Sequence, residues 1–512
     1  MTARTLTAPA NDPHASRVGR RGWAALAVLM LPVLLVSIDN TVLSFALPMI
    51  ALDLQPTGIQ QLWIVDVYSL VLAALLVTMG ALGDRFGRRR MLLIGASGFA
   101  VVSAATAFAP SAAWLIGGRA TMAVFGAMLM PSTLSLIRSI FGERRQRRLA
   151  IAIWAATFSA GAALGPVIGG VLLEHFAWGS VFLMAVPMLV PLLVGAPLLV
   201  PESRDPRPGR IDPIGVLLSV GAMLPIVYAI KEMAVTGLGG PVVPLLVAGA
   251  AFVVAFVRRQ RRSSEPMLDM RLFRRSAFSG ALLVNLLSIV ALVGFLFFVA
   301  QHLQLIIGLS PLEAGLALVP SLVAMIVAGL LVVPVSSRLS PRLVIPVALL
   351  FSAAGYIGIG LTTGPDTLLP TVLASISLGI GVGAAETVSN ELILSAAPVD
   401  KAGAASAVSE TAYELGAVLG TSIVGGLLTA VYRAGLAIPA GVPDALARAA
   451  RETLAGAMDV AQQLGGTVGA GLREAAAVAF DAGVGAASFI GAALVVLAGV
   501  IAATTLGGKQ NP

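Results

Sequence analysis

A short charged segment, GALGDRFGRRR at positions 80–90, separates two long apolar stretches of the chain. Asp84 and four arginines lie within it, and apolar residues at 62–83 and 91–109 flank it. An α-helix needs about 20 predominantly apolar residues to cross the hydrocarbon core of a bilayer. The pattern therefore predicts two membrane-spanning helices joined by a tight, charged turn.

The composition extends this prediction to the whole chain. Of the 512 residues, 58% are hydrophobic and 11% are charged, so a soluble fold could not cover its apolar side chains with a polar surface. The absence of cysteine excludes disulfides, zinc–thiolate sites and iron–sulfur clusters. The net charge of +8 lies in short loops, so we expect a lipid bilayer as partner and no nucleic acid.

Counting the apolar stretches gives fourteen predicted spans. Each should be a helix, because the backbone groups of a segment in lipid must bond within that segment. The predicted spans are 24–47, 62–83, 91–109, 114–136, 149–173, 180–200, 212–232, 241–257, 277–301, 312–335, 343–362, 368–392, 404–432 and 482–504.

The charges between these spans predict the orientation. With the N-terminus inside, the inner loops and tails hold 27 of the 33 lysines and arginines, and the outer side holds five, Lys231 among them. This bias is typical of the positive-inside rule, so both termini are expected in the cytoplasm. The Ala- and Gly-rich composition suggests a bacterial source, so we expect the chain in a bacterial inner membrane. Residues 1–22 are polar and basic, and they lack the apolar core of a removable signal peptide.

Two segments outside the spans have alternative interpretations. The basic stretch at 258–275 could bind anionic lipid headgroups or simply fix the topology. The outer segment at 433–481 has an amphipathic helical pattern. It could gate substrate release, lie on the membrane surface or act as a solvated spacer.

Several motifs resemble those of major facilitator transporters. The charged segment fits the pattern G-x-L-x-D-R-x-G-R-[RK] of the loop between helices 2 and 3, and GAALGPVIGG at 161–170 resembles the antiporter motif in helix 5. SIDNTVLSFALP at 37–48 resembles the helix 1 motif of the fourteen-helix drug:proton antiporter branch. The whole set looks most like the quaternary-ammonium exporters of the QacA and SmvA type. Further matches stand at 63–70, 129–137, 311–320 and 405–420.

The resemblance implies an all-α polytopic membrane protein with the major facilitator fold, in which two six-helix bundles flank two inserted helices. We expect it to work as a monomer. The predicted divisions are a cytoplasmic tail at 1–22, an N-terminal bundle at 23–200, a linker with two extra helices at 201–276, a C-terminal bundle at 277–504 that contains an extracellular loop at 433–481, and a cytoplasmic tail at 505–512.

The two best-defined motifs predict conformational roles. In the charged loop, glycines allow close packing, and the acid can accept from a helix N-terminus or pair with an arginine. The resemblance implies that this loop latches the outward-facing form, and a topology anchor is the alternative. In helix 5, glycines at four-residue spacing leave a smooth face and a proline favours a bend, which the resemblance links to closure without leak. The residues are Gly80, Asp84, Arg85, Gly87 and Arg88 in the loop, and Gly161, Gly165, Pro166 and Gly169 in helix 5.

Ionisable side chains inside the spans are the candidates for proton coupling and cation binding. A charge at the bilayer centre costs from about 3 to above 10 kcal/mol, so it needs a partner or a function. Glu410 and Glu414 lie one helical turn apart, and their repulsion favours one bound proton near neutral pH. We expect Arg119 to be the one buried base, and it matches the helix 4 arginine that the family associates with proton transfer. The full set is Asp39, Asp66, Arg119, Glu386, Glu410 and Glu414.

Aromatic rings are a second requirement for recognising lipophilic cations. Most aromatic side chains inside a membrane pack against lipid or neighbouring helices, so each candidate has that alternative. The candidates for substrate contact are Trp63, Tyr68, Phe125, Trp154, Phe158, Phe295, Tyr356 and Tyr413.

These patterns predict a proton-coupled multidrug efflux antiporter that exports lipophilic cations, such as quaternary ammonium compounds and dyes, by alternating access. A deprotonated acid would attract the cation, and protonation from outside would expel it. The chain has no phosphate-loop motif and no histidine beside a nucleophile or metal-ligand cluster, so we expect a secondary transporter and not an enzyme, without metal or cofactor. The alternatives are a proton-coupled exporter of an anionic or neutral metabolite, and a non-transporting membrane sensor on the same fold.

Overall fold

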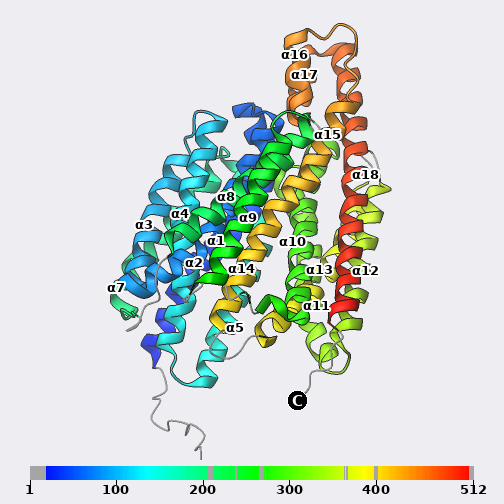
Figure 1. The fold of residues 1–512 in the computed structure, drawn as a ribbon. Helices are drawn as coiled ribbons and strands as arrows, with labels where there is room; N and C mark the ends of the chain where they lie inside the picture. The colour runs from blue at the N-terminus through cyan, green and yellow to red at the C-terminus, as the bar shows by residue number, and fades with distance from the viewer. Residues whose placement is uncertain are drawn as a thin grey trace, which may run out of the picture.

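The computed structural model describes residues 19–204, 212–236, 239–263, 270, 272–362, 364, 367–396 and 402–506. Within these ranges the chain is helical, with no strand, and thirteen segments are long and apolar enough to cross a membrane (Figure 1). The remaining predicted span corresponds to α3 (Arg88–Thr106), whose arginines lower its mean hydropathy. The predicted all-α membrane architecture is confirmed.

The N-terminal bundle follows the first six predicted spans. Its helices pack in the pairs α1 with α5, α2 with α4, and α3 with α4. The predicted span at 180–200 is divided at Met184 into two helices. The bundle consists of α1 (Arg20–Leu54), α2 (Gly58–Phe86), α3, α4 (Ala112–Ile140), α5 (Arg144–His175), α6 (Ser180–Leu183) and α7 (Ala185–Leu199).

Two inserted helices, α8 (Pro213–Thr236) and α9 (Val242–Arg262), pack against each other, and α8 also contacts α2. An ion pair links the end of α9 to the start of α8: Arg259 Nη2 lies 2.7 Å from Oδ1 of Asp212, the residue before α8. The hydrogen bonds from the Arg259 guanidinium hold the pKa of the Asp212 carboxyl below its ordinary value. The basic segment at 258–275 is described only at 258–263, 270 and 272–275.

The C-terminal bundle contains two π-helical turns that interrupt otherwise continuous spans. The turn η2 (His302–Ile306) ends α10, and η4 (Thr421–Gly425) divides the predicted span at 404–432 into α14 and α15. Such turns widen a helix locally and are frequent at functional sites. The helices are α10 (Ser276–Gln301), α11 (Pro311–Ser336), α12 (Pro341–Gly360), α13 (Leu368–Ala396), α14 (Ala402–Gly420), α15 (Gly426–Gly435) and α18 (Gly466–Thr505), with the short η1 (Leu272–Arg274) before α10.

The segment predicted as an outer loop contains two short helices, α16 (Asp444–Glu452) and α17 (Leu454–Leu464). They stand at one end of the molecule beside the first turns of α18, which begins well before the predicted span at 482–504 (Figure 1). The amphipathic pattern is explained by packing, because the apolar face of α17 contacts α18. We call this the α16–α17 end.

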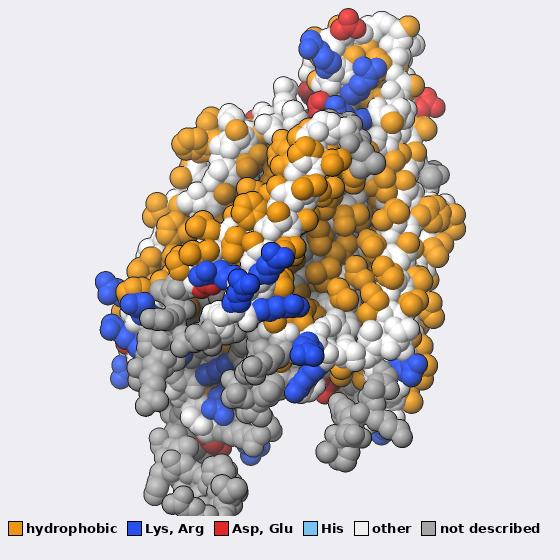
Figure 2. Space-filling model, viewed as in Figure 1, with side chains coloured by type: hydrophobic (Ala, Val, Ile, Leu, Met, Phe, Trp, Pro, Cys, Tyr) orange, Lys and Arg blue, Asp and Glu red, His pale blue; other side chains and the backbone are white. Residues whose placement is uncertain are grey.

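The opposite end carries most of the described basic side chains, and we call it the arginine-rich end (Figure 2). The first and last described residues also lie toward it (Figure 1). Its arginines lie at the α2–α3, α4–α5 and α11–α12 connections and at the end of α9. They are Arg85, Arg88, Arg89, Arg90, Arg138, Arg258, Arg259, Arg338 and Arg342.

The two bundles contact each other closely toward the α16–α17 end. Gln304 Nε2 of η2 donates to the Phe45 carbonyl of α1 at 3.2 Å, and a Cβ added at Gly170 of α5 would meet Leu312 Cα of α11 at 2.7 Å. The α16–α17 segment adds a further contact, because Glu452 Oε2 accepts from Gly58 N at 3.0 Å. These contacts close the α16–α17 end between the bundles.

Candidate functional site

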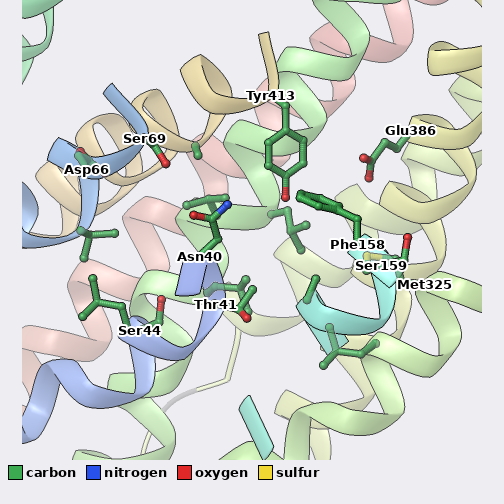
Figure 3. A pocket seen from close by; sticks show the side chains of 18 of the residues that line it. Asn40, Thr41, Ser44, Asp66, Ser69, Phe158, Ser159, Met325, Glu386 and Tyr413 are labelled. Carbon is green, nitrogen blue, oxygen red and sulfur yellow. The ribbon is translucent and has the colours of Figure 1, made fainter. Parts of the chain in front are cut away.

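A cavity lies between the two bundles (Figure 3). Its cavity volume is about 80 Å³, and the space around it is partly open to solvent. The N-terminal bundle contributes residues of α1, α2, α4 and α5 to its wall, and the C-terminal bundle contributes residues of α10, α11, α13 and α14. Its polar lining residues are Asn40, Thr41, Ser44, Asp66, Ser69, Arg119, Ser159, Glu386 and Tyr413.

The first charged feature of this region is a buried ion pair between α1 and α4. Arg119 Nη1 lies 2.6 Å from Asp39 Oδ2, and the two residues are 2% and 3% exposed. Arg119 also donates from Nε to the Ile64 carbonyl of α2 at 3.3 Å, and its guanidinium lies 4.7 Å from the centre of the Tyr68 ring. Arg119 therefore joins three helices, and Asp39 has a counter-charge in this conformation.

A second buried ion pair joins α2 to the inserted helices. Lys231 Nζ of α8 lies 2.7 Å from Asp66 Oδ2, and both side chains are at most 1% exposed. Ser422 Oγ of η4 donates to the same carboxylate oxygen at 2.9 Å. Asp66 thus holds together one helix from each bundle and one inserted helix.

The position of Lys231 differs from the sequence-based expectation. Counting placed Lys231 among the outer-side charges and left Arg119 as the one buried base, whereas both basic side chains are fully buried. In the sequence, Lys231 lies in the last turn of an apolar run, where a hydropathy count places the end of the membrane span. Its burial results from the packing of α8 against α2, which the sequence alone does not show.

Glu414 is the most buried of the three glutamates, at 3% exposed. It lies close to Ser69 and Asn40, and within the described part of the chain its Oε2 atom has no hydrogen-bond partner. Glu410 lies one turn away on the same helix and is partly exposed. Glu386 of α13 lines the cavity opposite Asp66 and faces the Tyr413 and Phe158 side of it (Figure 3).

Two of the eight aromatic candidates line the cavity, Phe158 of α5 and Tyr413 of α14. Their rings meet edge to face with centroids 5.8 Å apart, across the two bundles. Trp154 stacks on Phe158 at 6.4 Å and extends this aromatic wall.

The other five aromatic side chains lie against protein groups outside the cavity lining. Trp63 covers the Lys231 ammonium, Tyr68 lies under Arg119, and Phe125 contacts Gly98 of α3. Phe295 and Tyr356 meet each other edge to face at 6.3 Å, and the Tyr356 hydroxyl donates to the Ala291 carbonyl.

The charged loop between α2 and α3 makes its contacts within the N-terminal bundle. Asp84 Oδ1 accepts from Arg88 Nε at 2.8 Å, one helical turn away. Glu202, after α7, accepts from the backbone N–H groups of Arg89 and Arg90 at 3.0 and 3.2 Å. Gly87 has φ of +114°, a backbone conformation that favours glycine, and a Cβ there would also displace the Glu202 carboxylate, which lies 2.8 Å from its position.

The remaining two loop residues make local contacts. Gly80 of α2 faces the Pro131 ring of α4, and a Cβ added at Gly80 would lie 3.4 Å from Pro131 Cβ. The guanidinium of Arg85 is exposed and lies 5.8 Å from the centre of the Phe86 ring.

The glycine stripe of α5 lies directly on α1. A Cβ at Gly161 would meet Ser37 Cβ at 2.7 Å, one at Gly169 would meet Val42 Cγ2 at 2.5 Å, and one at Gly165 would overlap Thr41 Oγ1. Pro166, beside the stripe, presents its carbonyl to Gly315 of α11. The motif therefore sets the distance between α5 and α1 on one side and α11 on the other.

We expect Gly165→Leu to reduce the stability of the protein by about 1–3 kcal/mol and to impair transport, because the side chain would force α5 away from α1. Thermal unfolding of the purified variant measures the first effect, and a transport assay measures the second. The control is Gly117→Leu on α4, where an added Cβ would meet no atom within 4 Å. Equal stability of the two variants would contradict the packing role.

The sequence profile of the Major Facilitator Superfamily matches residues 29–421. The chain belongs to this superfamily. It is therefore a membrane transporter and not an enzyme, in agreement with the sequence-based prediction. A solved structure of a bacterial homologue of the human lysosomal transporter Spinster, in an inward-facing and unoccupied conformation, covers 96% of this chain and 99% of its own, with a TM-score of 0.65 at 19% identity. At that identity the likeness concerns the fold alone.

Named relatives cover almost the whole chain. The multidrug efflux pump LfrA of Mycolicibacterium smegmatis is 54% identical over 489 residues, which are 96% of this chain and 97% of that protein. The methyl viologen resistance protein SmvA of Salmonella typhimurium is 38% identical over 90% of this chain and 93% of its own. The tetracenomycin C resistance and export protein of Streptomyces glaucescens is 32% identical over 99% and 96%.

Proposed function

We propose that this chain is a proton-coupled multidrug efflux antiporter for lipophilic organic cations. The observation that carries the proposal is the cavity between the bundles, where Glu386 lies on the same side as the rings of Phe158 and Tyr413 and Asp66 lines the opposite wall (Figure 3). Carboxylates and aromatic faces both attract organic cations, and the apolar remainder of the wall suits a lipophilic body. The relatives named as a multidrug efflux pump and a methyl viologen resistance protein support the same substrate class.

The balance of charges around the cavity also supports cations. Asp39 and Asp66 each have a buried base as partner, whereas no ion pair of Glu386, Glu410 or Glu414 is present in the described residues. The buried or half-buried acids of this region, five in number, therefore outnumber its two buried bases, Arg119 and Lys231. A positively charged substrate would compensate this excess, and an anion would increase the cost of burial.

The proton and the cation would share these glutamates. Glu414 is buried close to Asn40 and Ser69, which line the cavity. A change in its charge would therefore change the electrostatic energy of a cation bound there. Deprotonated, it would attract the cation, and proton uptake from the outer side would remove that attraction and favour release. The proton motive force would then supply the energy, and no cofactor would be needed.

The orientation that fits export places the arginine-rich end in the cytoplasm of a bacterial inner membrane. Both described termini lie toward that end, which would put both tails inside (Figure 1). The contacts between the bundles at the α16–α17 end then correspond to a closed outer side. A cation would enter the cavity from the cytoplasm or the inner leaflet.

The test is a proteoliposome assay with a pH-sensitive dye inside the vesicles and ethidium, an aromatic quaternary ammonium, added under an imposed proton gradient. We expect ethidium-dependent proton flux with the wild-type protein and none with empty vesicles. Failure to observe flux with folded, correctly inserted protein would refute the cation proposal. The alternative of an anionic or neutral metabolite exporter, consistent with a relative named for tetracenomycin C export, would then take its place.

A further inference from the structure

Lys231 occupies a site that has the chemistry of an organic ammonium site. Its Nζ lies 2.7 Å from Asp66 Oδ2 and 4.3 Å from the centre of the Trp63 ring, so the charge meets one carboxylate and one aromatic face. The Tyr228 ring lies next to Trp63, with centroids 6.2 Å apart. Carboxylate and aromatic face together are the groups with which proteins recognise alkylammonium ligands.

Asp66 separates this site from the transport cavity. Asp66 lines the cavity on α2, whereas Lys231 is not part of the lining and approaches from α8, which packs against α2 and η4. Figure 3 places Asp66 in the cavity wall near Ser69. Asp66 therefore lies between the ammonium of Lys231, with which it is paired in this conformation, and the place that a positively charged ligand in the cavity would take.

We propose that Lys231 is a tethered competitor that limits how strongly cationic substrates bind at Asp66. The proposal rests on the proposed function, because it assumes that the cavity receives cations. While Lys231 neutralises Asp66, a substrate must displace the ammonium or bind without full use of the carboxylate. Such competition sets a lower limit on the dissociation constant and keeps release possible, since a buried, unpaired carboxylate would bind a cation too tightly to release it.

The proposal also gives the inserted helices a role in substrate recognition. Lys231 is contributed by the inserted helix α8. Ser422 of η4 holds the Asp66 carboxylate in place by donating to the oxygen that also contacts Lys231. The other charges around the cavity are the Asp39–Arg119 pair and the glutamates 386, 410 and 414. A purely mechanical role of Lys231, holding α8 against α2, would affect stability without changing the affinity for cations.

The experiment measures ethidium binding to the purified full-length protein in lipid nanodiscs by fluorescence anisotropy. Lys231→Met keeps the length of the side chain and removes its charge, and we expect it to lower the Kd for ethidium roughly fivefold or more. Lys231→Arg keeps the charge that pairs with Asp66, so it should change the Kd less than Lys231→Met does, although the guanidinium must repack against Trp63. In an Asp66→Asn background, Lys231→Met should no longer change the Kd.

Trp63→Leu provides a second route if Lys231→Met does not fold. It leaves both charges in place but removes the ring that holds the ammonium, so Lys231 should compete less well and the Kd should fall in the same direction. An unchanged Kd in Lys231→Met, or in Trp63→Leu where that variant must replace it, would overturn the proposal. So would an equal fall in the Asp66→Asn background.

The outcomes also separate this proposal from the proposed function. Wild-type binding and transport of ethidium with no effect of Lys231 would refute the competitor alone. Binding that appears only in Lys231→Met would support the competitor and count against ethidium-like cations as natural substrates. Absence of binding in every folded variant would refute both.

Discussion

Arg119→Met should lower the free energy of unfolding by about 3–5 kcal/mol, because it leaves the buried Asp39 carboxylate without its counter-charge. Asp39 is 3% exposed, so water cannot replace the lost partner. The substitution also removes the hydrogen bond to the Ile64 carbonyl and the contact with the Tyr68 ring, and thereby weakens the junction of α1, α2 and α4. Thermal unfolding in nanodiscs measures the loss, and ethidium-driven proton flux should be abolished.

The double variant Asp39→Asn/Arg119→Met separates the cause of this effect from simple loss of packing. It removes both charges at nearly constant volume, so most of the lost stability should return. Transport should not return if the pair takes part in coupling. Equal instability of the single and double variants would show that the contribution of Arg119 is packing and not charge compensation.

Glu414→Gln should reduce ethidium-driven proton flux roughly tenfold or more, because glutamine cannot release and take up a proton. The amide has almost the same shape and can still bond to Asn40 and Ser69, so the fold should be retained. The proteoliposome assay measures the flux, with the amount of inserted protein determined in the same vesicles. Ethidium exchange without a proton gradient should be less affected than net uphill transport.

Glu474→Gln is the matched control for this substitution. Glu474 lies exposed on α18 near the α16–α17 end, so the same chemical change there should leave the flux as in the wild type. Flux above half of the wild-type value in Glu414→Gln would move the coupling role to Glu386 or Asp39. The corresponding variants Glu386→Gln and Asp39→Asn identify which of the two carries it.

The membrane helices could be predicted because lipid leaves the backbone so few possibilities. An apolar segment of sufficient length must be helical, which is why the predicted spans correspond to helices in the structure. The interruptions could not be predicted in the same way. The π-helical turn at Thr421–Gly425 lies where α14 and the turn itself pack against α10, and the long extension of α18 packs against α17, so both depend on tertiary contacts.

The candidate site shows the same division between local and tertiary information. The acids and Arg119 are recognisable as charges inside apolar runs, but their partners are not, since Asp39 and Arg119 are 80 positions apart and Ser422 and Asp66 are 356 apart. Lys231 was misplaced because hydropathy counts a charge at the end of a run as solvated. The aromatic set illustrates the limit most clearly, because Phe158 and Trp63 look equivalent in sequence and only one of them lines the cavity.

The two buried ion pairs have an electrical consequence. Moving one elementary charge through the membrane voltage involves about 2.3 kcal/mol per 100 mV, but a contact pair of opposite charges has no net charge to move. The Asp39–Arg119 and Asp66–Lys231 pairs can therefore shift with their helices while the transmembrane field performs almost no work on them. If the proposed function holds, the voltage sensitivity of the cycle would then depend on Glu386, Glu410 and Glu414, which have no ion pair in the described residues, and on any ions that they bind.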